Sequence, residues 1–261
     1  MADLNFYTLA AVMVVLSVGF MGTMVRRGFY RAKKHQDEMA GEAARIGFTF
    51  ESRSPMLRHA SPFSRECIAS LAQTLKDTAG RAGSSAPDRY TDLVAESRDY
   101  LDFEIFKKSG RIGYVMKGRA AGTLTTTLAD YTYVEGSGKH RTTYQQTLAF
   151  FYLQGKVLPA FLVKPETILH KIGAIFGYQD IDFALNPEFS KHYLLRGAHE
   201  PSIRALFNPS ILNFFSKNPG WCVEGRGECL LVYTHGVLVQ PDRIKDHLDA
   251  CAAVVRNFYK V

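Results

Sequence analysis

The sequence predicts an α+β protein, with an antiparallel sheet, helices segregated to one side of it, and a single transmembrane helix ahead of the domain. Three observations predict it. An uncharged apolar run fills residues 6–24, short β-branched and aromatic runs fill residues 100–165, and an amphipathic helical pattern closes the chain at residues 241–259. The 261 residues, 46% hydrophobic and 22% charged, are typical of a globular protein with one core.

The first element is the run from Phe6 to Met24, FYTLAAVMVVLSVGFMGTM, which carries no charged side chain. At about 1.5 Å per residue, a helix of this length spans roughly the 30 Å of bilayer hydrocarbon. A signal peptide would begin with a positive region, whereas only Asp3 precedes this run and arginines follow it. We therefore expect a retained anchor with its basic flank over residues 1–34 and one domain over residues 35–261.

The basic flank predicts the orientation. Five cationic side chains follow the apolar run: Arg26, Arg27, Arg31, Lys33 and Lys34. Such residues stay in the cytoplasm and attract anionic lipid headgroups, so Met1 is expected outside and the domain inside. They also account for most of the net charge of +7, and no other basic cluster is interleaved with aromatic residues. The charge therefore indicates a lipid bilayer as partner and no nucleic acid.

A helical neck is expected next, from His35 to Ile46, with Met39 and Ala43 at helical spacing and Gly47 at its end. We interpret it as a solvated stalk. Farther along, the stretch AGRAGSSAPD at residues 79–88 predicts a flexible surface loop after a helix near residues 65–77.

The sheet is expected to be an antiparallel meander, because short turns join its first strands. These strands are placed at residues 101–107, 112–117, 122–134, 141–152 and 158–163. In the fourth of them, alternation puts Tyr144, Leu148, Phe150 and Tyr152 on one face. We therefore expect one face of the sheet to be buried and the other to contact water.

Helical and strand signals alternate in the last third of the chain. Helices are expected at residues 166–176, 201–207 and 209–216, and strands at residues 221–224, 229–234 and 237–239. Asn208 is the predicted N-cap of the third helix, with Pro209 at its first position. The last helix should cover the sheet with one apolar stripe, formed by Ile244, Leu248, Cys251, Val255 and Phe258.

Several segments together resemble a family of uncharacterised bacterial membrane-anchored proteins, each with one N-terminal helix before an α+β domain. The segments are GSGK, TLAFFYL, LPAFLVKPE, DIDF, PEFSKHYLLRG and HEPSIRALF, within residues 100–239. The most specific residues are Asp180, Asp182, Phe183, Phe189, Tyr193, Arg196, Gly197, Glu200 and Arg204. The resemblance implies a fold and a bacterial inner membrane, and it transfers no catalytic residue. Together with the orientation expected from the basic flank, this location puts the N-terminus in the periplasm.

The best candidate site is an acidic cluster of Asp180, Asp182, His192 and Glu200. In an extended segment, Asp180 and Asp182 project from one face, and carboxylates with imidazole can hold a divalent cation or act as a general base. The competing interpretation is structural, with the two aspartates capping helices or pairing with Arg196 and Arg204.

Other motifs fail on their spacing. The run Gly136–Lys139 lacks the glycine of a phosphate loop at Tyr133 and the hydroxyl residue after the lysine, where His140 stands, so a hairpin turn is expected. No Gly-x-Ser-x-Gly motif occurs. The four cysteines form no Cys-x-x-Cys pair, and we expect free, buried thiols.

The function expected from these patterns is that of a cytoplasmic interaction or scaffold domain, an accessory subunit of a larger inner-membrane assembly with a protein partner. No cofactor or metal is expected. The enzyme question stays open, with the non-enzyme favoured. The alternatives are a metal-assisted hydrolase built on Asp180, Asp182 and His192, and a lipid-binding module, the latter by analogy of fold alone.

Overall fold

A computed structural model describes residues 26, 30–52, 103–107, 110–121, 124–171 and 180–259. Within them, eight strands form one sheet in the order β1-β2-β3-β4-β8-β7-β5-β6, and every pairing is antiparallel. The strands are β1 (Thr49–Ser52), β2 (Gly110–Ala120), β3 (Leu124–Glu135), β4 (Thr142–Tyr152), β5 (Leu158–Pro165), β6 (Tyr193–Gly197), β7 (Trp221–Gly227) and β8 (Cys229–Thr234). The α+β class with an antiparallel sheet is therefore confirmed, but the expected meander is wrong beyond β4, which pairs with β8 and not with β5.

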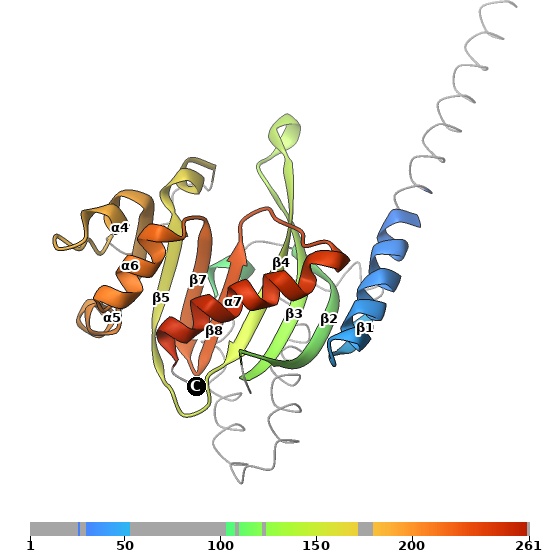
Figure 1. Cartoon of the computed structure of the whole chain (residues 1–261). Coiled ribbons are helices and arrows are strands. Elements are labelled where there is room, and N and C mark those ends of the chain that lie inside the picture. Colours follow the sequence, from blue (N-terminus) through green and yellow to red (C-terminus); the bar gives the residue numbers. More distant parts are fainter. Residues whose placement is uncertain are drawn as a thin grey trace, which may run out of the picture.

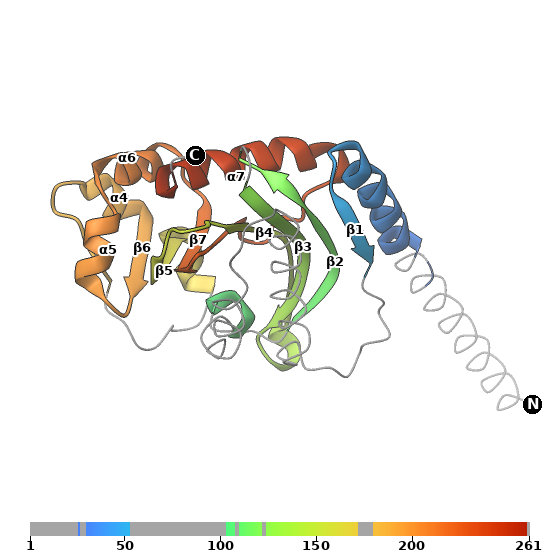
Figure 2. The same ribbon diagram turned by 90° about the horizontal axis from the view of Figure 1, so that it is seen from below.

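Helices fill the connections and the ends of the described chain. Their bounds are residues 30–45, η2 (Glu104–Lys107), η3 (Gly138–His140), η4 (Glu166–Lys171), α4 (Pro187–His192), α5 (Glu200–Leu206), α6 (Pro209–Lys217), η5 (Pro241–Arg243) and α7 (Ile244–Phe258). Helix α7 crosses one face of the sheet, and the helix over residues 30–45 lies beside the β1 edge (Figure 1). Seen from below, α6 and α7 lie on one side and η2 on the other (Figure 2).

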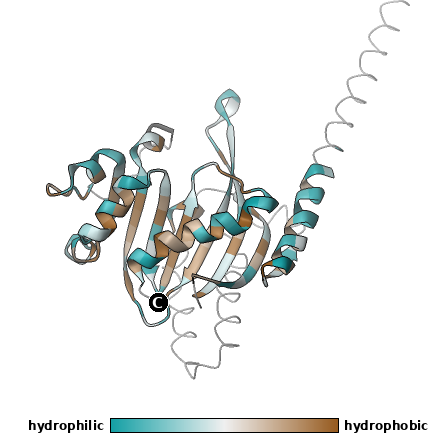
Figure 3. Cartoon of the chain, in the orientation of Figure 1, coloured by the Kyte–Doolittle hydropathy of each residue, from teal (hydrophilic) through white to brown (hydrophobic). Residues whose placement is uncertain are grey.

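Two apolar clusters lie on the two faces of the sheet. The larger one takes residues from every described α-helix, including Phe189 of α4 and Phe258 of α7, so the described α-helices share one face, as predicted. The smaller one joins Phe103 and Phe106 to Phe150 on the opposite face. Apolar residues concentrate in the central strands beneath α7 (Figure 3).

The expectation that one face of β4 contacts water is wrong for most of that strand. Residues 146–152 are all buried. Helix α7 and the larger cluster cover one face of this part of β4, and residues 103–106 cover the other. Only the end toward the hairpin, residues 142–145, carries exposed positions.

The solvated neck is also a wrong prediction. Met39 and Ala43 are 0% exposed and belong to the larger cluster, so the helix over residues 30–45 is part of the domain. It ends where predicted. Gly47 has a φ of +76°, and the N–H of Phe48 donates to the carbonyl of Ala43 at 2.7 Å, which satisfies the last turn.

Several element assignments differ from the prediction. The first expected strand is helical over Glu104–Lys107, and residues 237–239 form no strand. Pairing with distant partners creates the short strands β1 and β6, which no local pattern predicted. The caps at α6 are confirmed, since Asn208 Oδ1 accepts the N–H groups of Ser210 and Ile211, and the five predicted stripe residues of α7 are all buried.

The predicted anchor, Phe6–Met24, the loop at residues 79–88 and Cys67 lie outside the described residues. No helix among the residues that the structure describes is both long and apolar enough to cross a membrane.

Candidate functional site: a buried polar network at the helix over residues 30–45

The helix over residues 30–45 and the sheet meet at a buried polar network. Residues four apart share a helical face, so His35 points inward on the same side as Met39 and Ala43. Leu128 of β3 belongs to the larger cluster, and alternation along the strand places Asp130 on the same face as Leu128. An acidic side chain and an imidazole are therefore brought together in the core, 95 residues apart in the sequence.

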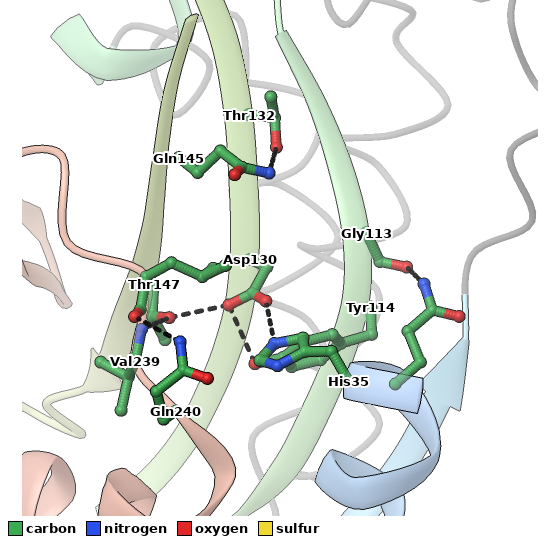
Figure 4. A network of polar contacts seen from close by, with 11 residues as sticks. His35, Gly113, Tyr114, Asp130, Thr132, Gln145, Thr147, Val239 and Gln240 are labelled. Carbon is green, nitrogen blue, oxygen red and sulfur yellow. Dashed lines mark hydrogen bonds and ion pairs between the residues drawn. The ribbon is translucent and has the colours of Figure 1, made fainter. Parts of the chain in front are cut away.

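Asp130 is the centre of this network. Its Oδ2 lies 3.1 Å from His35 Nε2, and its Oδ1 accepts the hydroxyls of Tyr114 at 2.9 Å and Thr147 at 2.7 Å. Figure 4 shows these three side chains converging on the carboxylate from the helix, β2 and β4. The side chains of His35 and Asp130 are 18% and 10% exposed, so the pair is largely removed from water.

The network continues to the segment that leads into α7. Thr147 Oγ1 accepts the N–H of Val239 at 3.0 Å, and the N–H of Thr147 donates to the carbonyl of Val237. Two further hydrogen bonds, both made by the side chain of Gln36, attach the helix to neighbouring strands. Gln36 Nε2 donates to the carbonyl of Gly113 at 3.2 Å, and Gln36 Oε1 accepts the hydroxyl of Ser52. One carboxylate thus links the helix, three strands and the start of the C-terminal segment.

Burial sets the protonation of the surrounding groups. It raises the pKa of Tyr114 well above the usual value, and the charge of Asp130 adds to the effect, so the phenol stays a donor. On α7, burial lowers the pKa of His247 to about 4, against the attraction of Asp130. His247 is therefore neutral at physiological pH, with its Nε2 3.5 Å from Cys251 Sγ.

A second buried polar group lies on the opposite face. Glu224 of β7 accepts the hydroxyl of Tyr233 at 3.1 Å and the backbone N–H of Glu104. Burial raises the pKa of the Glu224 carboxyl, and the charge of Lys164 opposes this rise. Lys164 lies on β5 and is 1% exposed. This group attaches η2 to the sheet, and burial raises the pKa of the adjacent Cys222 thiol to about 12.

The predicted acidic cluster is dispersed over separate local contacts. Asp180 Oδ1 accepts the N–H of Leu195 at 3.0 Å, and the N–H of Ile181 donates to the carbonyl of Leu195, so this segment covers the outer edge of β6. Burial raises the pKa of Asp180, which the Leu195 N–H opposes. His192 Nδ1 lies 2.8 Å from the Glu188 carbonyl of its own helix.

The expected pairing of the aspartates with arginine takes a different form. Arg204 reaches the backbone carbonyl of Asp182 at 2.7 Å rather than its carboxylate, and it forms an ion pair with Glu200 one turn away. Its guanidinium also lies 5.2 Å from the ring centroid of Phe183. Among the described residues, no group of three His, Cys, Asp or Glu side chains is placed to hold a metal ion.

The basic flank is exposed wherever the structure describes it, at Arg26, Arg31, Lys33 and Lys34, while Arg27 lies outside the described residues. Sequence reasoning missed His35, Tyr114, Asp130 and Thr147. One signal was present: an aspartate interrupts the strand-forming run LTTTLADYTYV on the face that also carries Leu128. A charged residue at such a position requires partners in the core.

No known protein family, curated protein or solved structure matches this chain.

Proposed function

We propose that the protein is a membrane-anchored cytoplasmic scaffold, an accessory subunit of an inner-membrane assembly whose domain is held at a fixed orientation to the bilayer. The observation that carries the proposal is the burial of the helix over residues 30–45, in which Met39 and Ala43 are fully buried and His35 contacts Asp130. Arg26, two residues after the predicted end of the anchor at Met24, is helical, and the described helix runs on from residue 30. A flexible tether would need no such contacts.

A fixed orientation is useful to a protein that presents one surface to a partner in the same membrane. Chains confined to the bilayer meet at high effective concentration, and a rigid connection selects which face meets the partner. Large apolar side chains that are exposed on the domain, Val157 and Leu185 among them, are positions at which contact with a partner can be probed. The proposed location is the bacterial inner membrane, with the N-terminus periplasmic and the domain cytoplasmic.

The hydrolase alternative gains no specific observation: Asp180 and His192 make local hydrogen bonds, and no group of three His, Cys, Asp or Glu side chains among the described residues is placed to hold a metal ion. We therefore do not propose it.

The anchor is tested by washing membranes with alkaline carbonate. We expect the full chain to stay in the pellet, because burying about nineteen apolar residues in lipid is far stronger than surface adsorption. A phosphatase fused after Val261 should be inactive and a fluorescent protein there should glow. Release into the supernatant would contradict the anchor, and an active phosphatase would reverse the orientation.

The scaffold role is tested by photocrosslinking in cells. A photoreactive amino acid replaces Val157, Leu185 or Val237 in turn, and we expect at least one position to give a single crosslinked protein in the membrane fraction. A short Gly–Ser insertion after Arg27 keeps the anchor and the His35–Asp130 contact but loosens their connection, and it should reduce that crosslink. Absence of any crosslink from a chain shown to reside in the membrane would count against the scaffold.

A further inference from the structure

The β3–β4 hairpin extends beyond the rest of the sheet. The two strands pair with each other as far as Glu135 and Thr142, whereas the described part of β2 pairs with β3 as far as Tyr133 and β8 pairs with β4 as far as Leu148. Within the described ladders, the end of the hairpin therefore has no other strand beside it. Figure 1 shows it as the green loop projecting above the sheet.

The hairpin tip, defined as residues 136–143, is basic and polar. Every one of these residues is exposed, and the sequence GSGKHRTT contains Lys139, His140 and Arg141 but no acidic or large apolar residue. Gly136 is required at the bend, because its φ is +82° and a Cβ there would lie 2.1 Å from the carbonyl oxygen of His140. The tip is hydrophilic in Figure 3. Such a surface suits contact with anionic groups and not insertion into hydrocarbon.

The tip and the N-terminal end of the helix over residues 30–45 point to the same side of the domain, and both ribbon views agree on this (Figures 1 and 2). The contact between His35 of the helix and Asp130 of β3 is a common reference point, from which lengths along both elements can be compared. Glu135 follows Asp130 by five residues, which is about 17 Å of strand. Arg31 lies four residues before His35, which is about 6 Å along the same helix. The tip and the exposed basic end of the described helix therefore lie on the same side of the buried contact.

We propose that the hairpin tip binds the anionic lipid headgroups of the membrane that holds the anchor, an inference that rests on the proposed function. Lys139 and Arg141 contact phosphate groups there, while Arg31, Lys33 and Lys34 of the helix make the second contact. Two separate contacts on one bilayer surface hold the tilt of the domain more firmly than the anchor and its helix do alone. The orientation of the scaffold is thereby set by lipid as well as by the buried helix.

The test uses the full chain in nanodiscs with a Cys67→Ser background, whose remaining cysteines, Cys222, Cys229 and Cys251, are buried. A fluorophore on Ser137→Cys reports the tip, and one on Lys156→Cys reports the turn at the opposite end of β4. Nitroxide groups in the lipid headgroups quench a nearby fluorophore. We expect quenching of the tip label and not of the control in discs with anionic lipid, and its loss in neutral lipid or at high salt.

Charge reversal sharpens the test. The double variant Lys139→Glu and Arg141→Glu should weaken the lipid contact roughly tenfold or more, since each basic residue contributes appreciably near an anionic surface. Lys156→Glu should leave the quenching unchanged. Because the tip is exposed on all sides, these variants are expected to melt like the parent, which a thermal scan verifies.

Each outcome is decisive. A chain that fails to enter discs overturns the anchor itself. A chain that inserts but shows an unquenched tip, or a tip equally quenched in neutral and anionic discs, overturns the lipid contact alone. Tip labels that respond only after a cell extract is added would assign the tip to a protein partner and would likewise overturn it.

Discussion

Asp130 and Asp180 are both aspartates whose carboxylates accept hydrogen bonds, but the two regions around them use the charge differently. Asp130 lies in the core and joins a helix to three strands through His35, Tyr114 and Thr147. Asp180 lies at the edge of the sheet, where its carboxylate accepts the backbone N–H of Leu195. Burial makes the first carboxylate indispensable to its neighbours, whereas water can replace the second.

The largest expected effect follows from removing the buried carboxylate. Asp130→Ala leaves two buried hydroxyls and His35 without their acceptor, so the free energy of unfolding should fall by about 3 to 5 kcal/mol. Asp130→Asn keeps one acceptor oxygen and should lose less. Urea denaturation of the full chain in detergent, followed by fluorescence of the single Trp221, measures the change. A loss of under about 1 kcal/mol for Asp130→Ala would remove the distinction between the two regions.

The free energy of unfolding should also depend on pH through His247 of α7, which feels the charge of Asp130. Its pKa is about 4 in the folded chain against 6.5 ordinarily, so between these values the unfolded state binds more protons. The contribution of neutral His247 to the free energy of unfolding is therefore complete above pH 6.5. It is lost as the pH drops toward 4, which lowers the free energy of unfolding by about 3 kcal/mol at most. His247→Gln should flatten that part of the pH dependence, with the exposed His192→Gln as control. Parallel curves for His247→Gln and the parent would contradict the prediction.

The contrast between the regions also explains what the sequence could predict. The turn at Gly136–Gly138, the capped helix at Asn208 and the apolar stripe of α7 depend on residues close together in the chain, and they were predicted correctly. The hairpins that pair β2 with β3 and β3 with β4 followed from alternation and short turns. These features are local, so one window of sequence contains all of their determinants.

The errors involve partners far apart in the sequence. Strand β1 exists because Thr49–Ser52 pairs with β2, more than 60 residues later, and the neck is core because the sheet covers Met39. The His35–Asp130 contact spans 95 residues, so neither residue indicates the other. The acidic cluster stays a prediction: Asp180 and His192, near in sequence, make separate hydrogen bonds, with the Leu195 N–H and the Glu188 carbonyl.

The smallest expected effect concerns that exposed cluster. Asp180→Ala removes the acceptor of the Leu195 N–H, which then bonds to water, so the cost should be about 0.5 to 1.5 kcal/mol. Asp180→Asn retains an acceptor oxygen and should recover most of this loss. Asp182→Ala should change the stability by less than about 0.5 kcal/mol, because the contact at that residue is the backbone carbonyl that Arg204 binds.

Thermal melts of these variants, repeated with magnesium, manganese or zinc, decide between a structural and a metal-binding role for the acids. A structural Asp180 lowers the melting temperature of Asp180→Ala by about 1 to 6 °C, and the parent responds to none of the three ions. A metal site behaves in the opposite way, because a bound ion stabilises the folded chain in proportion to its occupancy. A parent that melts several degrees higher with one ion, beside an Asp180→Ala variant that keeps its fold but loses that shift, would make the hydrolase the leading hypothesis. Asp182→Ala separates the two cases further, since a shared ion requires both carboxylates, whereas the edge contact at Leu195 requires only Asp180.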